Sequence, residues 1–266
     1  MSATQTGTAQ AQGELWSARA DDWAEVHEHN MSPVYAAVLD LAHAGPGVSI
    51  LEVGCGSGTA LRMAADRGAH VTALDAAPAF VEHARRRVPG ADVRVGDLQF
   101  LPYEDGEFDV VVGFNSFQYA ADVPAALGEA RRVLRDGGCL GVMVWGPSEQ
   151  CDLAPHLAAV GALLPPPPPG APGPFRLSEP GALSQLVEEA GFEVKIVADA
   201  VAAFVYPDEP TALRGLLSAG PCVKAMAHSG EDAVRDAVLD SIAPYRRDDG
   251  AYAFDNVWRF AIARKA

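Results

Sequence analysis

Short apolar runs alternate with helical patterns through the middle of the chain. The runs of strand length cover residues 48–53, 70–75, 93–95, 108–113 and 139–145. Between them, apolar residues recur at helical spacing over residues 57–67, 78–88 and 123–134. Strands that alternate with helices in this way predict right-handed crossovers and a parallel sheet.

The segment before the first strand reads as two helices. In the first, Leu15, Trp16, Trp23 and Val26 recur at spacings that share one helix face. The second follows Ser32-Pro33, where serine can cap and proline can open the first turn, and it stops at a Gly-Pro-Gly sequence. We expect these helices to form a lid.

The alternation breaks after the fifth strand. Residues 146–178 contain a run of five prolines and several glycines, which predicts a loop over the surface. Regularity returns with a helix over 179–190 and a strand that starts at Phe192 and continues toward Val205. A helical stretch then precedes a last strand over residues 252–263.

These patterns predict a single α/β domain behind a short tail. The expected parts are a disordered tail (1–12), the domain (13–266) with N-terminal lid helices (14–44), two core segments (46–146 and 179–266), and a loop (146–178) and helical insert (208–243) that form a substrate lid.

A glycine-rich turn joins the first strand to its helix. From Glu52 to Thr59 the sequence reads E-V-G-C-G-S-G-T, with glycines at positions 54, 56 and 58. Glycine lets the backbone turn tightly and approach a ligand, and a helix N-terminus supplies free N–H groups. A dinucleotide fingerprint, G-x-G-x-x-G, would need glycine in place of Thr59. The carboxylate of Glu52 favours instead a cationic ligand that carries an amino group and a sulfonium.

Polar residues also follow the next three strands. Asp75 ends the second strand and can accept both hydroxyls of a ribose, and no neighbouring Arg or Lys indicates a 2′-phosphate. After the third strand, Asp97 can accept an adenine amino group while Leu98 covers the ring. Asn115 lies at the carboxyl end of the fourth strand, where open α/β sheets bind ligands.

Taken in this order and spacing, the motifs of residues 48–145 resemble those of class I S-adenosylmethionine-dependent methyltransferases. The motifs are E-V-G-C-G-S-G, the L-D that ends in Asp75, G-D-L, F-D-V-V-V-G-F-N and V-L-R-D-G-G. The resemblance implies a three-layer α/β sandwich with a seven-stranded, mostly parallel sheet whose last strand is antiparallel. It also implies S-adenosylmethionine as the cofactor and S-adenosylhomocysteine as the product.

The resemblance further assigns a set of residues to the cofactor. The glycine-loop residues would line the methionine and ribose part, the next acidic residue would hold the ribose, the G-D-L residues the adenine, and the asparagine would lie near the methionine. The full set is Glu52, Gly54, Gly56, Gly58, Asp75, Ala76, Gly96, Asp97, Leu98, Asn115 and Gln118.

Charge narrows the class of methyl acceptor. Lys and Arg number 20 against 35 Asp and Glu, so the formal net charge is −15. An acidic protein repels phosphate backbones, which argues against a nucleic-acid substrate. Residues 115–118 read N-S-F-Q, which departs from the D/N-P-P-Y/F of methyltransferases that act on exocyclic amines of nucleic acids. We expect an oxygen, nitrogen or carbon nucleophile on a small, partly hydrophobic metabolite, of the kind found in bacterial natural-product biosynthesis.

Other features bear on location and partners. The sequence shows no signal peptide and no run long enough to span a bilayer. Its four cysteines have neither pairing nor metal spacing, which indicates free thiols in a reducing cytoplasm and no metal site. The apolar helical insert is a candidate surface for a homodimer.

The sequence identifies no obligatory catalytic base. His29, Tyr119 and Tyr206 are the candidates. Three other functions stay open: a nicotinamide-dependent dehydrogenase, which Thr59 disfavours, an enzyme that uses S-adenosylmethionine for a reaction other than methyl transfer, and a cofactor-binding regulator without catalysis.

Overall fold

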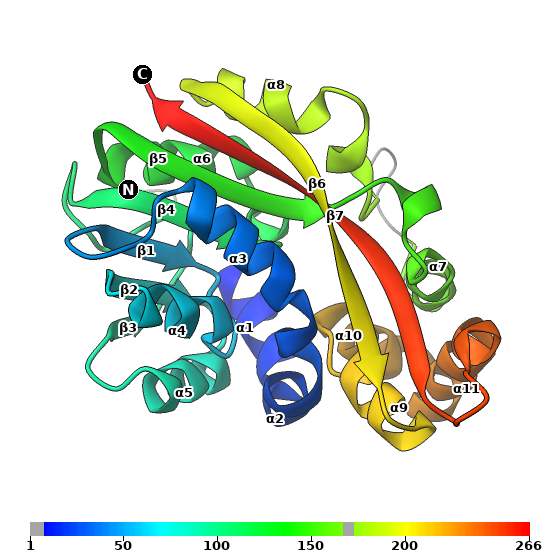
Figure 1. Ribbon diagram of the computed structural model, residues 1–266. Coiled ribbons are helices and arrows are strands. Elements are labelled where there is room, and N and C mark those ends of the chain that lie inside the picture. The colour runs from blue at the N-terminus through cyan, green and yellow to red at the C-terminus, as the bar shows by residue number, and fades with distance from the viewer. Residues whose placement is uncertain (1–7, 167–172) are drawn as a thin grey trace, which may run out of the picture.

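A seven-stranded sheet forms the centre of the protein in the computed structural model, which describes residues 8–166 and 173–266 (Figure 1). The strand order is β3-β2-β1-β4-β5-β7-β6. The strands are β1 (Ser49–Val53), β2 (His70–Asp75), β3 (Asp92–Val95), β4 (Phe108–Phe114), β5 (Leu134–Trp145), β6 (Phe192–Tyr206) and β7 (Tyr252–Lys265).

The pairing confirms the predicted sheet. Strands β1 to β5 pair in parallel, and β7 is antiparallel to both β5 and β6. The central strand β4 is buried along nearly its whole length, as its apolar run predicts. The chain therefore has the expected three-layer α/β fold with one antiparallel strand.

Helices cover both faces of the sheet. Side chains of α3 (Ser32–Leu41) and α4 (Thr59–Asp66) pack with Ile50, Val110 and Val112 on one face, which α5 (Pro78–Arg87) extends over β2 and β3. Helices α6 (Val123–Val133) and α8 (Ala182–Glu189) pack on the opposite face. Alternate residues of the central strands β1 and β4 thus enter two separate apolar layers.

The N-terminal segment is longer in helix than the sequence predicts. It comprises α1 (Ala9–Ser17), α2 (Ala20–Asp22), η1 (Trp23–His27) and η2 (Glu28–Met31). The predicted disordered tail was wrong for residues 9–12, which lie in α1, and residues 1–7 are outside the described residues. The Thr8 hydroxyl donates to the Tyr119 carbonyl at 2.6 Å, and Gly13 packs directly on the backbone of Ala76. Tertiary contacts therefore order a segment whose composition is that of a tail.

The predicted loop over residues 146–178 also contains a helix. Helix α7 (Ala154–Ala162) begins with a proline in its first turn and packs against α11 (Glu231–Ile242), burying Val160. The loop prediction was wrong for this stretch. It gave weight to the nearby prolines and overlooked the alanine-rich, apolar residues of 154–162, which form the helix. Residues 167–172, within the proline run, lie outside the described residues.

The predicted helical insert is confirmed as α9 (Glu209–Leu217), α10 (Gly220–Ser229) and α11. Strand β5 pairs with β7 only as far as Trp258, whereas β6 and β7 stay paired as far as Tyr206 and Tyr252. The helical insert connects β6 and β7 at the end of this extension. Figure 1 shows these helices beside that extension, next to the N-terminal helices. Short 3-10 turns complete the fold: η3 (Phe117–Tyr119), η4 (Ser148–Gln150), η5 (Arg176–Ser178) and η6 (Ala243–Tyr245).

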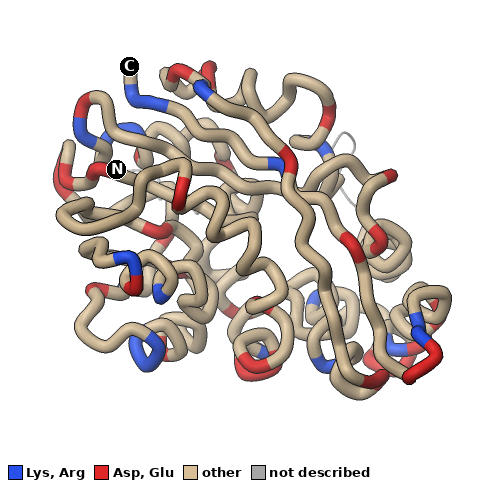
Figure 2. The backbone as a smooth tube through the Cα atoms, viewed as in Figure 1, with Lys and Arg blue, Asp and Glu red and all other residues tan. Residues whose placement is uncertain are grey.

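Charged residues lie on loops, helices and strands alike, with Lys and Arg scattered among Asp and Glu (Figure 2). The four cysteines are buried and unpaired with one another. Within the described ranges, no helix is long and apolar enough to cross a membrane, and no group of three His, Cys, Asp or Glu side chains is placed to hold a metal ion.

Candidate functional site

A cavity lies at the carboxyl ends of β1, β2 and β4, beneath the N-terminal segment. The space between its walls, with the open mouth included, amounts to about 830 Å³. Residues of three kinds line it: the glycine loop with the ends of β1 and β2 (Glu52, Gly54, Cys55, Gly56, Leu74, Asp75, Ala76), residues of α5, of the end of β4 and of the segments after β3 and β4 (Phe80, Gly96, Asp97, Leu98, Phe114, Asn115, Ser116, Tyr119), and the N-terminal segment together with α3 (Thr8, Ala9, Gln12, Trp16, Trp23, Glu28, Met31, Tyr35).

The glycine loop adopts the backbone that only glycine takes readily. Gly54, Gly56 and Gly58 have φ values of +71°, +53° and +86°. Gly54 and Gly56 line the cavity, but Gly58 does not. A Cβ added to Gly58 would lie 2.9 Å from atoms of Ala84 on α5, so this glycine serves the close packing of α4 on α5. Gly58 was predicted to contact the ligand, but its position outside the cavity wall does not fit that role.

Asp75 is held by the backbone around it. One carboxylate oxygen accepts from Gly56 N and the other from Ala77 N, each at 2.8 Å. Burial raises the pKa of this carboxyl to about 6, although the two backbone N–H groups oppose the rise. Each carboxylate oxygen has two lone pairs and accepts one of these bonds, so the Asp75 side chain, which lines the cavity, can still accept from a ligand.

Glu52 is a buried acid with an unused oxygen. The side chain is 3 % exposed, and its Oε2 has no hydrogen-bond partner in the described structure. Burial raises its pKa well above the usual range, and the nearby carboxylates of Glu28 and Asp75 raise it further. A buried acid that faces a cavity without a partner fits a cationic ligand group.

The predicted adenine residues Gly96, Asp97 and Leu98 all line the cavity. Asp97 Oδ1 accepts from Gln99 N at 2.8 Å, which fixes the loop after β3. Asn115 also lines the cavity with φ of +54°, a strained conformation at a strand end.

Gln118 does not line the cavity. Its Nε2 donates to Asn115 Oδ1, so it orients the Asn115 amide from behind. Its own Oε1 is buried without a partner in the described residues.

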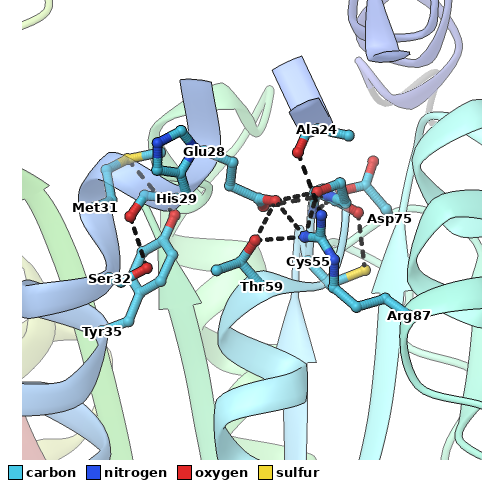
Figure 3. A network of polar contacts seen from close by, with 12 residues as sticks. Ala24, Glu28, His29, Met31, Ser32, Tyr35, Cys55, Thr59, Asp75 and Arg87 are labelled. Carbon is cyan, nitrogen blue, oxygen red and sulfur yellow. Dashed lines mark hydrogen bonds and ion pairs between the residues drawn. The ribbon is translucent and has the colours of Figure 1, made fainter. Parts of the chain in front are cut away.

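Sequence reasoning missed a polar network centred on Glu28. This side chain reaches from η2 to the N-terminus of α4, where its Oε1 accepts from Ser57 N at 3.2 Å. Its Oε2 accepts from the Ser57 hydroxyl, from Thr59 Oγ1 at 2.7 Å and from Arg87 Nη1 at 3.2 Å. Figure 3 shows dashed lines joining the Glu28 carboxylate, Thr59 and the Arg87 guanidinium to one another. The network connects the N-terminal segment to the glycine loop and to α5. No local sequence pattern predicts it, because Glu28 and Ser57 are 29 positions apart.

An aromatic group covers the cavity from the N-terminal side. Trp16 lies 5.0 Å from Trp23 and 5.6 Å from Tyr119 between ring centroids, and Phe80 lies 6.2 Å from both tryptophans. The spacing of Trp16 and Trp23 along the sequence predicted a shared helix face. The helix is broken between them, however, and the two rings meet through tertiary packing.

The three catalytic candidates are in different surroundings. Tyr119 lines the cavity, and burial raises its pKa to about 12. His29 is exposed on η2, and Tyr206 is fully buried with its hydroxyl 2.8 Å from His27 Nδ1. Neither His29 nor Tyr206 is among the cavity-lining residues, because η2 turns His29 outward and the insert encloses Tyr206. Their predicted catalytic role does not fit these positions.

Comparison with known proteins gives the family. A family model described as a methyltransferase domain matches residues 51–142. An uncharacterised protein of Mycobacterium tuberculosis is 30 % identical over 249 residues, which cover 82 % of this chain and 81 % of that protein. A protein of Mycolicibacterium smegmatis named a probable S-adenosylmethionine-dependent methyltransferase is 36 % identical over 162 residues, 58 % of this chain and 56 % of its own. The chain belongs to the class I S-adenosylmethionine-dependent methyltransferases.

Other similarities are more partial. The malonyl-[acyl-carrier protein] O-methyltransferase of Serratia marcescens is 38 % identical over 103 residues, 39 % of this chain and 40 % of that enzyme. The chain spans 32 % of a 37.1 kDa Streptomyces fradiae transposon protein, to which it is 42 % identical over 111 residues, 40 % of the chain. A solved candidate methyltransferase from Bacillus halodurans superimposes with a TM-score of 0.57 at 17 % identity, covering 87 % of this chain and 98 % of that one, which shows the fold.

The cofactor of this methyltransferase family is S-adenosylmethionine, and the cavity fits it. The unpartnered Glu52 oxygen suits its cationic part, and the Asp75 carboxylate has acceptor capacity left for a ribose. Apolar Leu98 lies beside Asp97 in the cavity wall, as an adenine site requires.

Proposed function

We propose that the protein transfers the methyl group of S-adenosylmethionine to an oxygen, nitrogen or carbon nucleophile of a small, partly hydrophobic metabolite. The observation that supports this most strongly is the single cavity wall that combines Glu52, Asp75 and Asp97 with an aromatic cover. The acids match the cofactor, and the aromatic side chains offer a face to an acceptor of low polarity.

The cofactor supplies a methyl group already activated by its sulfonium. The protein's part is to bind, orient and exclude water. In the proposed arrangement Glu52 faces the amino group, Asp75 the ribose hydroxyls, and Asp97 with Leu98 the adenine. Trp16 and Trp23 then close the cavity from the N-terminal side, and the acceptor approaches beside Tyr119, whose neutral hydroxyl can orient it by a hydrogen bond.

The charge of the chain supports a small acceptor. The formal net charge of −15 disfavours the approach of a nucleic acid. The N-terminal segment also narrows the cavity, because α1 rests directly on the backbone of Ala76. We infer that the N-terminal helices act as a lid, with the insert behind them.

A nicotinamide dinucleotide is the weaker candidate ligand. Its pyrophosphate would need the free N–H groups at the N-terminus of the helix after the glycine loop. There the protein's own Glu28 carboxylate already accepts from Ser57 N and Thr59 Oγ1. An anionic ligand group at this place would meet a carboxylate.

The experiment incubates the protein with S-adenosylmethionine and a panel of small phenols, alcohols, carboxylic acids and amines. We expect S-adenosylhomocysteine to form together with a methylated product, detected by mass spectrometry, and Asp75→Ala to suppress both. An acceptor that is transformed without formation of S-adenosylhomocysteine would contradict methyl transfer and favour a different use of the cofactor.

A further inference from the structure

Two hydrogen-bond donors in the cavity wall lack a strong acceptor among the described residues. The indole Nε1 of Trp23 is buried without a partner, and a Cβ added to Gly56 would lie 3.7 Å from it. The phenol of Tyr35, which is 4 % exposed, reaches only the thioether of Met31 at 3.5 Å, and sulfur accepts weakly. Both side chains line the cavity.

Both donors are uncharged. Burial raises the pKa of the Tyr35 phenol well above its usual range, and the carboxylates of Glu28 and Glu52 add to the rise against the opposing effect of Arg87. The Tyr35 hydroxyl therefore keeps its proton, and an indole N–H does not ionise. The cavity wall thus offers two uncharged hydrogen-bond donors to a ligand.

The cavity wall contains no basic side chain in the described part of the chain. Its charged members are Glu28, Glu52, Asp75 and Asp97. The guanidinium of Arg87, which contacts the cavity-lining Glu28, also donates to the hydroxyls of Ser57 and Thr59 and to the carbonyl of Ala24. An anionic group of a ligand would find only neutral donors here.

S-adenosylmethionine carries one such group, the carboxylate of its amino acid end. The proposed function places the amino group at Glu52, and the carboxylate is bonded to the same carbon as that amino group. It must therefore lie close to Glu52, in the cavity that Tyr35 and Trp23 also line.

Resting on that cofactor site, we propose that the Trp23 indole N–H and the Tyr35 hydroxyl bind the carboxylate of the cofactor, so that this chain recognises it with neutral donors in place of a basic residue. The nearby Glu28 does not prevent this, because it is paired with Arg87 and accepts from Ser57 and Thr59. Neutral donors hold an anion through hydrogen bonds alone, and hydrogen bonds to a charged acceptor are strong where the donors are buried. Each of the two donors should therefore contribute strongly to the affinity for the carboxylate.

The test compares S-adenosylhomocysteine with its decarboxylated analogue, which has a hydrogen in place of the carboxylate. In calorimetric titrations, the unmodified protein should bind S-adenosylhomocysteine at least about tenfold more tightly than the decarboxylated analogue. Trp23→Phe and Tyr35→Phe should each lower the affinity for S-adenosylhomocysteine by about tenfold. Each should change the affinity for the analogue by less than about twofold. The double variant should bind the two ligands about equally.

Trp16→Phe is the matched control. Trp16 belongs to the same aromatic group and lines the same cavity, but its Nε1 already donates to Gln12 Oε1 at 3.1 Å. We expect this variant to leave the preference between the two ligands unchanged.

Equal affinity of the unmodified protein for the two ligands would overturn the proposal without any variant. Equal weakening of both ligands by Trp23→Phe and Tyr35→Phe would also overturn it, because these residues would then only shape the cavity. If neither adenosine compound bound the unmodified protein, the cofactor site itself would be wrong, and that result is distinct from a lost preference.

Discussion

Glu52 and Asp75 are acids that the folded protein holds where their charge is disfavoured. Both are buried, and burial raises the pKa of each. A cationic cofactor removes part of this cost by supplying the opposite charge, so the same positions that weaken the free protein strengthen the complex. Unfavourable burial of this kind marks the cavity as a binding site more clearly than any single motif does.

The first prediction concerns Glu52→Gln and the pH dependence of stability. Because the pKa of Glu52 is raised on folding, its contribution to stability is complete below about pH 4.5 and is lost as pH rises toward the folded value. Glutamine does not ionise, so the variant escapes this loss. Thermal unfolding between pH 4 and pH 8 should show equal midpoints near pH 4 and an advantage for Glu52→Gln of about 2–4 °C at pH 7.

The affinity of Glu52→Gln for S-adenosylmethionine should fall at the same time, since the amino group loses its carboxylate. Midpoints that run parallel across the whole pH range would show that Glu52 ionises as easily in the folded protein as in the unfolded chain. The account of the residue would then be wrong.

The N-terminal segment is the element that turns a sheet edge into an enclosed cavity. Its turns η1 and η2 bring Trp23 and Glu28 to the glycine loop, and α1 packs on Ala76 through Gly13. Glu28 holds this arrangement from a buried position, and its partner Arg87 is 30 % exposed. The segment should therefore depend on this pair for its position.

A double-mutant cycle of Glu28→Ala and Arg87→Ala measures that dependence. Urea unfolding should show a loss of about 2–3 kcal/mol for Glu28→Ala, because the change leaves donors at the α4 N-terminus unpaired, and a coupling of about 1–2 kcal/mol with Arg87→Ala. Arg86→Ala is the control on the same helix, since the one ion pair of Arg86 within residues 8–166 and 173–266 is an exposed one with Glu82 at 4.0 Å. It should change stability by less than about 0.5 kcal/mol. Strict additivity of the two central changes would contradict the coupling.

The elements differ in how far the sequence predicts them. The strands and the glycine loop can be predicted from local patterns. Apolar runs, the spacing of apolar residues and glycines in tight turns depend only on residues that are close in the sequence. The helical order of residues 9–12 and helix α7 do not, because both depend on partners far along the chain, such as Tyr119 for Thr8 and α11 for α7. The Glu28 network was missed for the same reason, whereas Glu52, Asp75 and Asp97 were found because each lies within two residues of the end of a strand.

At the scale of the whole molecule, the sheet order places the ends of β1, β2 and β4 side by side, and the N-terminal segment returns to cover them. Residues separated by up to 111 positions, Thr8 and Tyr119, meet at the rim of one cavity. The fold thus gathers the cofactor residues of the family motifs under a cover that the motifs do not contain. The central claim is that this cavity binds S-adenosylmethionine.

The most direct test is a calorimetric titration of the protein with S-adenosylmethionine, S-adenosylhomocysteine and NAD, repeated with Asp75→Ala. We predict micromolar binding of the two sulfur compounds, equivalent to about −8 kcal/mol, and no heat with NAD. Asp75→Ala should weaken the binding by about 1.5–3 kcal/mol through the loss of the ribose contact. Binding of NAD without binding of S-adenosylmethionine would contradict the assignment of the cavity.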